Sequence, residues 1–172
     1  MRLILRPLRQ DDERVAHAAQ LALAADDFPF LLEHDDDLTW SRYLERLAEV
    51  RIGVNLAANR VPMTFLVAEV GGRIVGRTSI RHELTDWLLA RGGHIGYGVL
   101  PDARRRGYAA EILRQSLVIA RSYDVRDALL TADDSNTPSI RVIESCGGRR
   151  DPQWPGDVLD GKPIGRYWIP IT

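Results

Sequence analysis

Hydrophobic residues along the chain recur at two different spacings, and the change from one to the other marks where strands and helices are expected. Apolar faces at helical spacing, with capping residues before them, predict helices over residues 15–25, 38–50, 107–123 and 138–146. Runs rich in β-branched and aromatic residues predict strands over residues 3–8, 64–70, 73–81, 93–100, 126–131, 153–159 and 164–171. Residues 87–91 fit either a short helical turn or a loop.

The order of these elements predicts the fold class. It reads β-α-α-β-β-β-α-β-α-β-β, which combines antiparallel hairpins with βαβ crossovers. Gly71-Gly72 stands between two of the strands and favours a two-residue hairpin turn. Neither an internal repeat nor a low-complexity linker divides the sequence. We therefore predict a single α/β domain over residues 1–172, with a central mixed sheet of the α+β kind.

Composition narrows the classes of function. The chain has 172 residues, is 45% hydrophobic and carries a net charge of −1, which argues against a general nucleic-acid binder. The first apolar run is too short for a signal peptide, and no stretch approaches the roughly 20 apolar residues that cross a bilayer. Cys146 is the only cysteine, so an internal disulfide is impossible. We expect a cytoplasmic protein that binds neither nucleic acid nor a membrane.

Residues 104–109 carry the clearest candidate chemistry. They read Arg-Arg-Arg-Gly-Tyr-Ala and stand between an apolar strand and a strongly amphipathic helix. A helix start presents unpaired N–H donors and the positive end of the helix dipole, and such a place binds phosphate readily. Gly107 would let the backbone approach an anion closely. A solvated arginine run before a helix is the alternative interpretation.

The spacing Arg-x-x-Gly-x-Ala in this loop resembles the pyrophosphate loop of the GNAT superfamily of N-acetyltransferases, and the order of elements is similar to that of the same family. The resemblance implies acetyl-coenzyme A as co-substrate, an amine on a small molecule or peptide as acceptor, and no metal. One arginine of the three would reach the 3′-phosphate instead of the pyrophosphate. The residues that it implies for the pyrophosphate are Arg104, Arg105, Arg106, Gly107, Tyr108 and Ala109.

The strand before the loop is also given a role by the resemblance. In the family this strand splays from the next one, here between residues 94–100 and 126–131, and the pantetheine arm of the coenzyme pairs with the exposed backbone. Val99 and Leu100 match the positions that meet the arm, and the N–H of Val99 would face the thioester oxygen. Gly96 and Gly98 predict a bulge or a close approach by another group. An ordinary central strand is the alternative.

The helix start at Asn136 completes the implied coenzyme site. Asn136 and Ser139 match or nearly match the family pattern, and Asn136 would contact the pantetheine amides. Ile143 stands where the family commonly has the tyrosine that protonates the leaving thiolate, and Ser145 stands where it has a lysine. The general acid is therefore left open. Tyr97 and Tyr108 are possible acids, although neither matches the family position.

The catalytic base has two candidates. Direct attack of an amine on the thioester needs a group that takes a proton and has a pKa near 7. His94 is the first candidate because many relatives carry glutamate at its position and because histidine titrates in the right range. His82 and Glu83, at the end of the preceding strand, are the second. For each, a surface or core-edge residue is the alternative.

The acceptor side is marked by acidic and aromatic residues. The segments 26–30 and 34–37 are either a solvated acidic loop with a helix cap or the mouth of a pocket that favours a cationic amine. Three aromatic side chains would line such a pocket, with residues 153–155 opposite them: Phe28, Phe30 and Trp40. The resemblance also makes a homodimer possible, with Trp168 and Ile169 as contact residues.

Two hypotheses of function follow from these residues. The leading one is an N-acetyltransferase that moves an acetyl group from acetyl-coenzyme A to a primary amine. The alternative is a catalytically weak module of the same fold that only binds the coenzyme, and the missing tyrosine at position 143 favours it.

Overall fold

The strands form two sheets. The computed structural model describes residues 2–154, 156–159 and 161–171. The first sheet has the order β1-β2-β3-β4, and its strands are β1 (Leu3–Arg6), β2 (Met63–Val70), β3 (Arg73–Arg81) and β4 (Ile95–Val99). The second has the order β5-β8-β6, with β7 also paired to β8, and its strands are β5 (Asp127–Asp133), β6 (Arg149–Arg150), β7 (Asp157–Leu159) and β8 (Lys162–Pro170).

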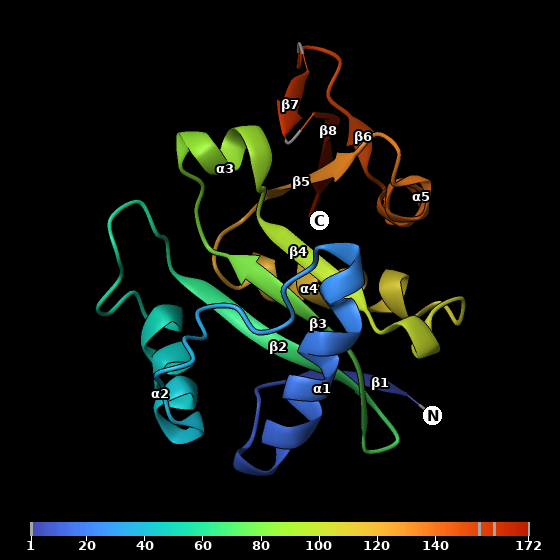
Figure 1. Ribbon diagram of the computed structural model, residues 1–172. Helices are drawn as coiled ribbons and strands as arrows, with labels where there is room; N and C mark the ends of the chain where they lie inside the picture. The colour runs from blue at the N-terminus through green and yellow to red at the C-terminus, as the bar shows by residue number, and fades with distance from the viewer. Residues whose placement is uncertain (1, 155, 160, 172) are drawn as a thin grey trace.

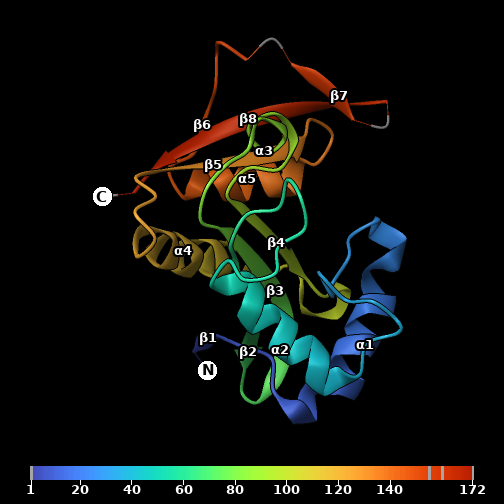
Figure 2. The same cartoon turned by 90° about the vertical axis from the view of Figure 1, so that its left-hand side faces the viewer.

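The helices cover both faces of the first sheet. They are α1 (Glu13–Leu23), α2 (Trp40–Arg51), α3 (Asp86–Arg91), α4 (Tyr108–Arg121) and α5 (Thr137–Ser145), and short 3-10 turns lie at Gln10–Asp12, Ala24–Asp26 and Pro101–Ala103. Figure 1 shows α1 in front of this sheet and α4 behind it. In Figure 2 the second sheet lies at the top, with α5 beside β5, and α1 and α2 lie below. No helix in the described part of the chain is long and apolar enough to span a membrane.

All the expected helices and strands are present, and the differences lie in pairing and in short elements. The structure places the strands in two sheets instead of one mixed sheet, and each pairing among the described residues is antiparallel. Residues 87–91 belong to a helix, α3, and the two-residue strand β6 was not expected. Pro155, within the strand expected over 153–159 and the expected pocket wall, lies outside the described residues.

The two faces of β3 can be told apart by their neighbours. The hydroxyl of Ser116 on α4 donates to Thr78 Oγ1 at 2.9 Å, so the even-numbered residues of β3 face α4. Arg77 donates to the carbonyl of Pro29, which follows α1, so the odd-numbered residues face the α1 and α2 side. The register pairs Ser79 with Gly96, so Gly96 shares that second face.

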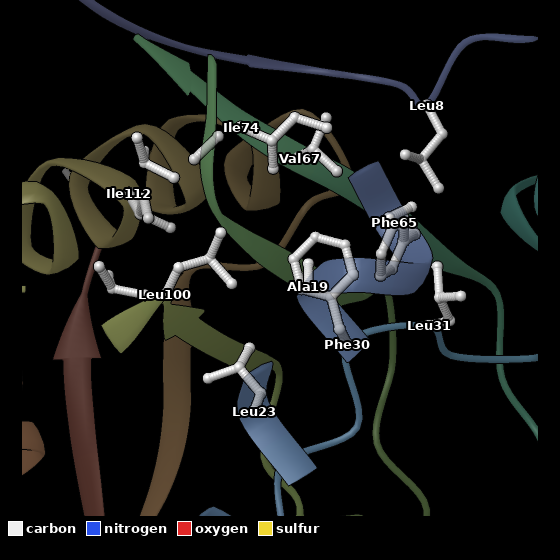
Figure 3. Packing of buried hydrophobic residues seen from close by; sticks show 14 of the residues in the cluster. Leu8, Ala19, Leu23, Phe30, Leu31, Phe65, Val67, Ile74, Leu100 and Ile112 are labelled. Carbon is white, nitrogen blue, oxygen red and sulfur yellow. The ribbon is translucent and has the colours of Figure 1, made fainter. Parts of the chain in front are cut away.

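Two hydrophobic clusters hold the layers together. The first joins α1 and the segment after it to the first sheet, and Figure 3 shows Phe30, Phe65 and Leu23 within it. The rings of Phe30 and Phe65 meet edge to face, 6.5 Å apart. The second cluster includes Leu113 from α4 and Ile169 from β8. Ile169 is only 2% exposed, so it belongs to the core and does not offer the exposed dimer contact that was expected of it.

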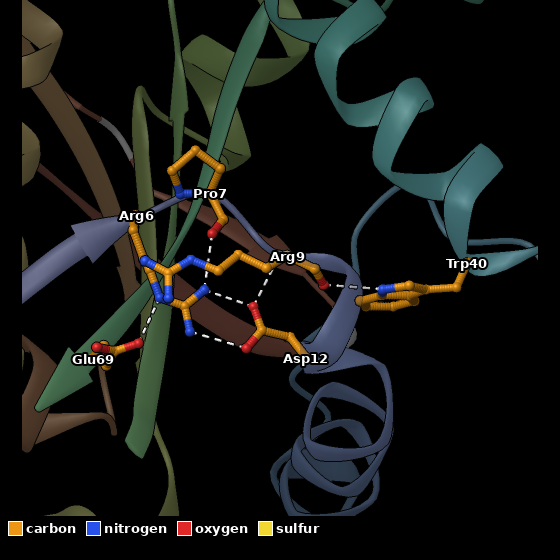
Figure 4. Close-up of polar contacts among 6 residues, drawn as sticks. All are labelled: Arg6, Pro7, Arg9, Asp12, Trp40 and Glu69. Atoms are coloured by element: carbon orange, nitrogen blue, oxygen red, sulfur yellow. Dashed lines mark hydrogen bonds and ion pairs between the residues drawn. The ribbon is translucent and has the colours of Figure 1, made fainter. Parts of the chain in front are cut away.

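A buried ion network ties the N-terminal strand to both neighbouring helices (Figure 4). Arg6 donates to both carboxylate oxygens of Asp12, at 2.6 and 2.9 Å, and to Glu69 Oε2 at 2.6 Å. Asp12 also accepts the N–H of Arg9, whose carbonyl accepts the indole N–H of Trp40 on α2. Burial opposes ionisation of Asp12, but its bonds to Arg6 and Arg9 prevail and hold the pKa of this carboxyl below its usual value.

Replacing Arg6 should destabilise the fold strongly. Arg6→Met leaves Asp12 and Glu69 without their cation, and breaking a buried ion pair costs about 3–5 kcal/mol. Arg42, whose side chain is 43% exposed on α2, also pairs with a carboxylate, and Arg42→Met should cost less than about 1 kcal/mol. Urea unfolding of both variants at pH 7 measures the difference. Equal losses of unfolding free energy would contradict the role given to the Arg6 network.

Candidate functional site

Among the described residues, backbone hydrogen bonding joins the two sheets at one point, beside the start of β4. The backbone N–H of His94 donates to the carbonyl of Leu129 at 2.7 Å, and the N–H of Leu129 donates to His94 Nδ1 at 2.9 Å. Gly93 precedes this contact with a φ of 65°, and a Cβ there would lie 2.4 Å from the Leu129 carbonyl oxygen. Among the described residues, no backbone hydrogen bond joins β4 to β5 beyond this point.

The edge of β4 that faces away from β3 is therefore open. Arg81 donates its N–H to His94 and Leu100 donates its N–H to Val75, so the even-numbered residues of this segment bond to β3. Backbone groups in an antiparallel pair point alternately toward the partner and away from it. The N–H of Val99 consequently faces the open edge, as the prediction for the thioester requires. The N–H of Leu100 does not, because Val75 already accepts it.

The glycines of β4 make room for side chains and not for a bulge. The register between β3 and β4 runs without a shift, whereas the shift in this sheet falls between Ala68 and Glu69. The expectation of a bulge at Gly96 and Gly98 was wrong. A Cβ at Gly98 would lie 2.5 Å from the ring of Phe28, so the glycine lets this ring pack on the strand.

The loop before α4 has the geometry of an anion site. Arg105 and Gly107 both take left-handed conformations, with φ of 63° and 79°, and Gly107 caps α4 without a side-chain hydrogen bond. The first N–H groups of a helix have no partner within it, so those of Tyr108 and Ala109 are available. A Cβ at Gly107 would meet nothing within 4 Å. The loop therefore fits a phosphate group, which would lie against backbone N–H groups at the positive end of the helix dipole.

The three arginines of the loop differ in what they contact. Arg104 donates from Nε to the Val99 carbonyl at 3.1 Å, and its guanidinium pairs with Asp26. Arg105 and Arg106 are exposed, and their side chains make no hydrogen bond or ion pair with any described residue. A phosphate at this loop would therefore meet two guanidinium groups that have no ion pair with a described residue. The contact of Asp26 also places one acid of the 26–30 segment at this loop.

The start of α5 lies against Tyr97 of β4. Asn136 caps the helix by accepting the N–H of Ser139 at 3.2 Å, and the hydroxyl of Tyr97 lies 3.1 Å from Ser139 Oγ. Burial raises the pKa of Tyr97 to about 12, although the bond with Ser139 opposes the rise. Ile143, at the family tyrosine position, is 1% exposed and belongs to the second cluster. The alternation along β4, which puts Tyr97 on the face opposite its glycines, was the sequence signal for this placement.

His94 is a neutral donor in this geometry. It is 8% exposed, and burial, followed by the nearby charge of Arg81, lowers its pKa to about 4. Because Nδ1 accepts the N–H of Leu129, the ring proton of the neutral form lies on Nε2. The ring can therefore donate a hydrogen bond, but to accept a proton it would have to give up its bond with Leu129.

The second pair of base candidates lies at the end of β3. His82 Nε2 is 2.9 Å from Thr64 Oγ1, and its ring stacks on Tyr123 at 3.5 Å. Burial lowers the pKa of His82. Glu83 is exposed. No group of three or more metal-ligating side chains occurs within the described ranges.

Comparison with known proteins settles the family. Residues 2–149 match the model of the acetyltransferase (GNAT) domain. The chain belongs to this family. It is accordingly an acyltransferase by family and a GNAT protein by fold, and a comparison with curated proteins returns no significant match.

Solved structures agree with this fold. The chain resembles yncA from Salmonella typhimurium, solved with its cofactor acetyl-CoA, with a TM-score of 0.65 at 17% identity over 99% of this chain and 94% of that one. It also resembles the spermidine N-acetyltransferase of Vibrio cholerae in complex with CoA and spermine, with a TM-score of 0.66 at 17% identity over 98% and 95%. An acetyltransferase from Agrobacterium tumefaciens matches at 21% identity, with a TM-score of 0.61 over 96% and 90%.

Gly107→Glu should abolish coenzyme binding and leave the fold intact. A carboxylate would then occupy the phosphate position and repel the ligand. Gly72→Glu is the matched control, because Gly72 has a φ of 80° and open space around its Cβ position but lies in the β2–β3 turn. Both variants carry the same backbone strain of roughly 1–2 kcal/mol. Calorimetric titration with coenzyme A tests the loop, and unchanged affinity in Gly107→Glu would disprove the assignment.

His94 should titrate with a midpoint near 4. NMR of the imidazole signal, assigned with His94→Gln, measures it. An unfolded histidine has a pKa of about 6.5, so the unfolded chain binds more protons below that pH than the folded chain does. The free energy of unfolding should therefore fall as the pH drops from about 6.5 toward about 4, and His94→Gln should weaken this dependence. A midpoint above about 6 would restore His94 as a base.

Proposed function

We propose that this acetyltransferase moves an acetyl group from acetyl-coenzyme A to a primary amine by direct nucleophilic attack. The open start of α4 beside the open edge of β4 is the observation that supports the proposal most. The amine acceptor is also supported by the fold neighbour described as a spermidine N-acetyltransferase, and the co-substrate by the neighbour solved with acetyl-CoA.

In this proposal the chain holds the coenzyme at three places. The N–H groups of Tyr108 and Ala109, with the unpaired Arg105 and Arg106, bind the pyrophosphate. Arg104 orients the loop through Asp26 and the Val99 carbonyl. The N–H of Val99 faces the thioester oxygen, and the capped start of α5, at Asn136 and Ser139, lies along the pantetheine arm.

Two protons must move during the transfer. The amine nitrogen bonds to the acetyl carbon while the carbon–sulfur bond breaks, so the amine loses a proton and the thiolate gains one. Tyr97 is the acid in this proposal, because its hydroxyl lies beside Ser139 at the start of α5 and carries a proton at neutral pH. Of the three predicted bases, Glu83 is the exposed carboxylate, and it would take the proton through water. His94 would act as a donor through Nε2.

A coenzyme-binding module with weak catalysis is the second candidate. The burial of Ile143 at the tyrosine position and the low pKa of His94 favour it. A thiol-release assay with acetyl-coenzyme A and a panel of small amines, amino acids and peptides separates the two candidates. Amine-dependent release supports the enzyme, whereas tight coenzyme binding without release supports the module.

Tyr97→Phe should lower kcat by about 100-fold or more, which is the usual contribution of a general acid. The affinity for coenzyme A should change little, since the ring stays in place. Tyr167→Phe also removes a hydroxyl from a buried tyrosine, but in the second sheet, and it should leave kcat unchanged. If Tyr97→Phe retained the full kcat, the proton of the leaving thiolate would have another source.

A further inference from the structure

Two guanidinium groups come close to Gly96 on the α1 and α2 side of the first sheet. Arg77, Ser79 and Arg81 lie on this face of β3, and the register sets Gly96 of β4 opposite Ser79. The position of a Cβ at Gly96 would be 3.2 Å from Ser79 Oγ, 3.8 Å from Arg77 Nη1 and 4.0 Å from Arg81 Nη1. A side chain at position 96 would therefore crowd Ser79 and lie beside both cations.

Arg77 is buried without a counter-ion. It is 2% exposed and donates only to neutral oxygens: the carbonyls of Pro29 and Gly96, at 2.5 and 3.3 Å, and Ser79 Oγ at 3.2 Å. Its Nε is buried and has no partner. No described carboxylate forms an ion pair with it. A buried charge in this state is costly, so a bound anion would stabilise it.

Arg81 is the second cation, and not all of its N–H donors are used by described residues. Its Nη1 makes long bonds to the carbonyls of Gly92 and Gly93, at 3.4 and 3.2 Å, and its other nitrogens have no described partner. It is only partly buried, so these donors can reach a ligand. Burial, followed by the nearby charge of Arg81, lowers the pKa of Arg77 to about 9.

Two acids that precede and follow Phe28 in the sequence are engaged with other arginines. Asp26 pairs with Arg104, and Glu33 pairs with both Arg46 and Arg60. Over the guanidinium of Arg77 lies the ring of Phe28, with its centroid 4.0 Å away. At the β3–β4 face itself, the charged side chains of Arg77 and Arg81 are positive.

We propose that Arg77, Arg81 and Ser79 bind a carboxylate of the acceptor, so that the acceptor is an amino acid or a similar small amine bearing a carboxylate. The inference rests on the proposed function. The planar fork of an arginine matches a carboxylate in geometry and charge. The group of Arg77, Ser79 and Arg81 also adjoins His94, at the point where the two sheets separate, because Arg81 donates its N–H to the His94 carbonyl. A carboxylate held there leaves the amine of the same molecule free to reach the open edge of β4.

Matched acceptors test the charge requirement. Thiol release is measured with methionine, methioninamide and 3-(methylthio)propylamine, and with lysine, lysinamide and cadaverine, each compared at equal concentration of free amine. The proposal expects kcat/KM for the carboxylate member to exceed that of its partners by about tenfold or more, the effect of one charge-assisted hydrogen bond. Equal or faster reaction of the amides and amines would overturn it.

Substitutions test whether the preference for a carboxylate depends on the group of Arg77, Ser79 and Arg81. Arg81→Gln should lower kcat/KM for the amino acid by about 10- to 100-fold, and leave the amide and the KM for acetyl-coenzyme A unchanged. Gly96→Ala places a methyl group 3.2 Å from Ser79 Oγ and should also lower kcat/KM for the amino acid. Arg60→Gln removes a neighbouring cation that is already paired with Glu33 and should have no effect. Equal losses for acid and amide would assign Arg81 a structural role and contradict the proposal.

A binding measurement separates this inference from the proposed activity. If no amine supports release, N-acetylmethionine and N-acetylmethioninamide are titrated by calorimetry in the presence of coenzyme A. At least tenfold tighter binding of the acid, lost in Arg81→Gln, would uphold the carboxylate site while the acetyltransferase proposal failed. Equal binding of the two, or none, would overturn the site itself.

Discussion

The arrangement of the site depends on the contact between His94 and Leu129. Two hydrogen bonds there, one through the imidazole, join the first sheet to the second and replace a continuous ladder between β4 and β5. Beyond them the outer edge of β4 pairs with no strand in the described part of the chain. An unpaired edge is a liability unless something covers it. In this acetyltransferase we expect a ligand to cover the edge of β4, because the edge leads directly to the open start of α4.

The distribution of charge is the second constraint, and it cannot be seen from the net charge of −1 alone. Acids and arginines pair along the surface and around the N-terminal strand, as at Arg6. Near the candidate site, four arginines form no ion pair with a described residue: Arg105 and Arg106 at the loop, and Arg77 and Arg81 on the α1 and α2 side of β3. The first pair suits the phosphates of the donor, and the second suits a carboxylate on the acceptor. One chain would then hold both reactants by their negative groups.

Local sequence was sufficient for the elements and for the position of the loop before α4, since hydrophobic spacing, the Gly-Gly turn and the glycine before α4 act over a few residues. It was not sufficient where a partner lies far along the chain. The low pKa of His94 depends on burial and on the charge of Arg81, and the contact of Tyr97 with Ser139 depends on where α5 packs. The core position of Ile169 and the absence of a bulge at Gly96 likewise follow from packing between distant elements. Whether His94 and Glu83 act in the reaction stays a prediction.

Amide hydrogen exchange with and without coenzyme A tests the central claim most directly, because it reports on the backbone donors themselves. The account predicts slower exchange on binding at Val99 and over residues 105–110, with little change in β8 on the far side of the second sheet. Protection confined to other segments, with the amides of Val99 and the start of α4 unaffected, would contradict it.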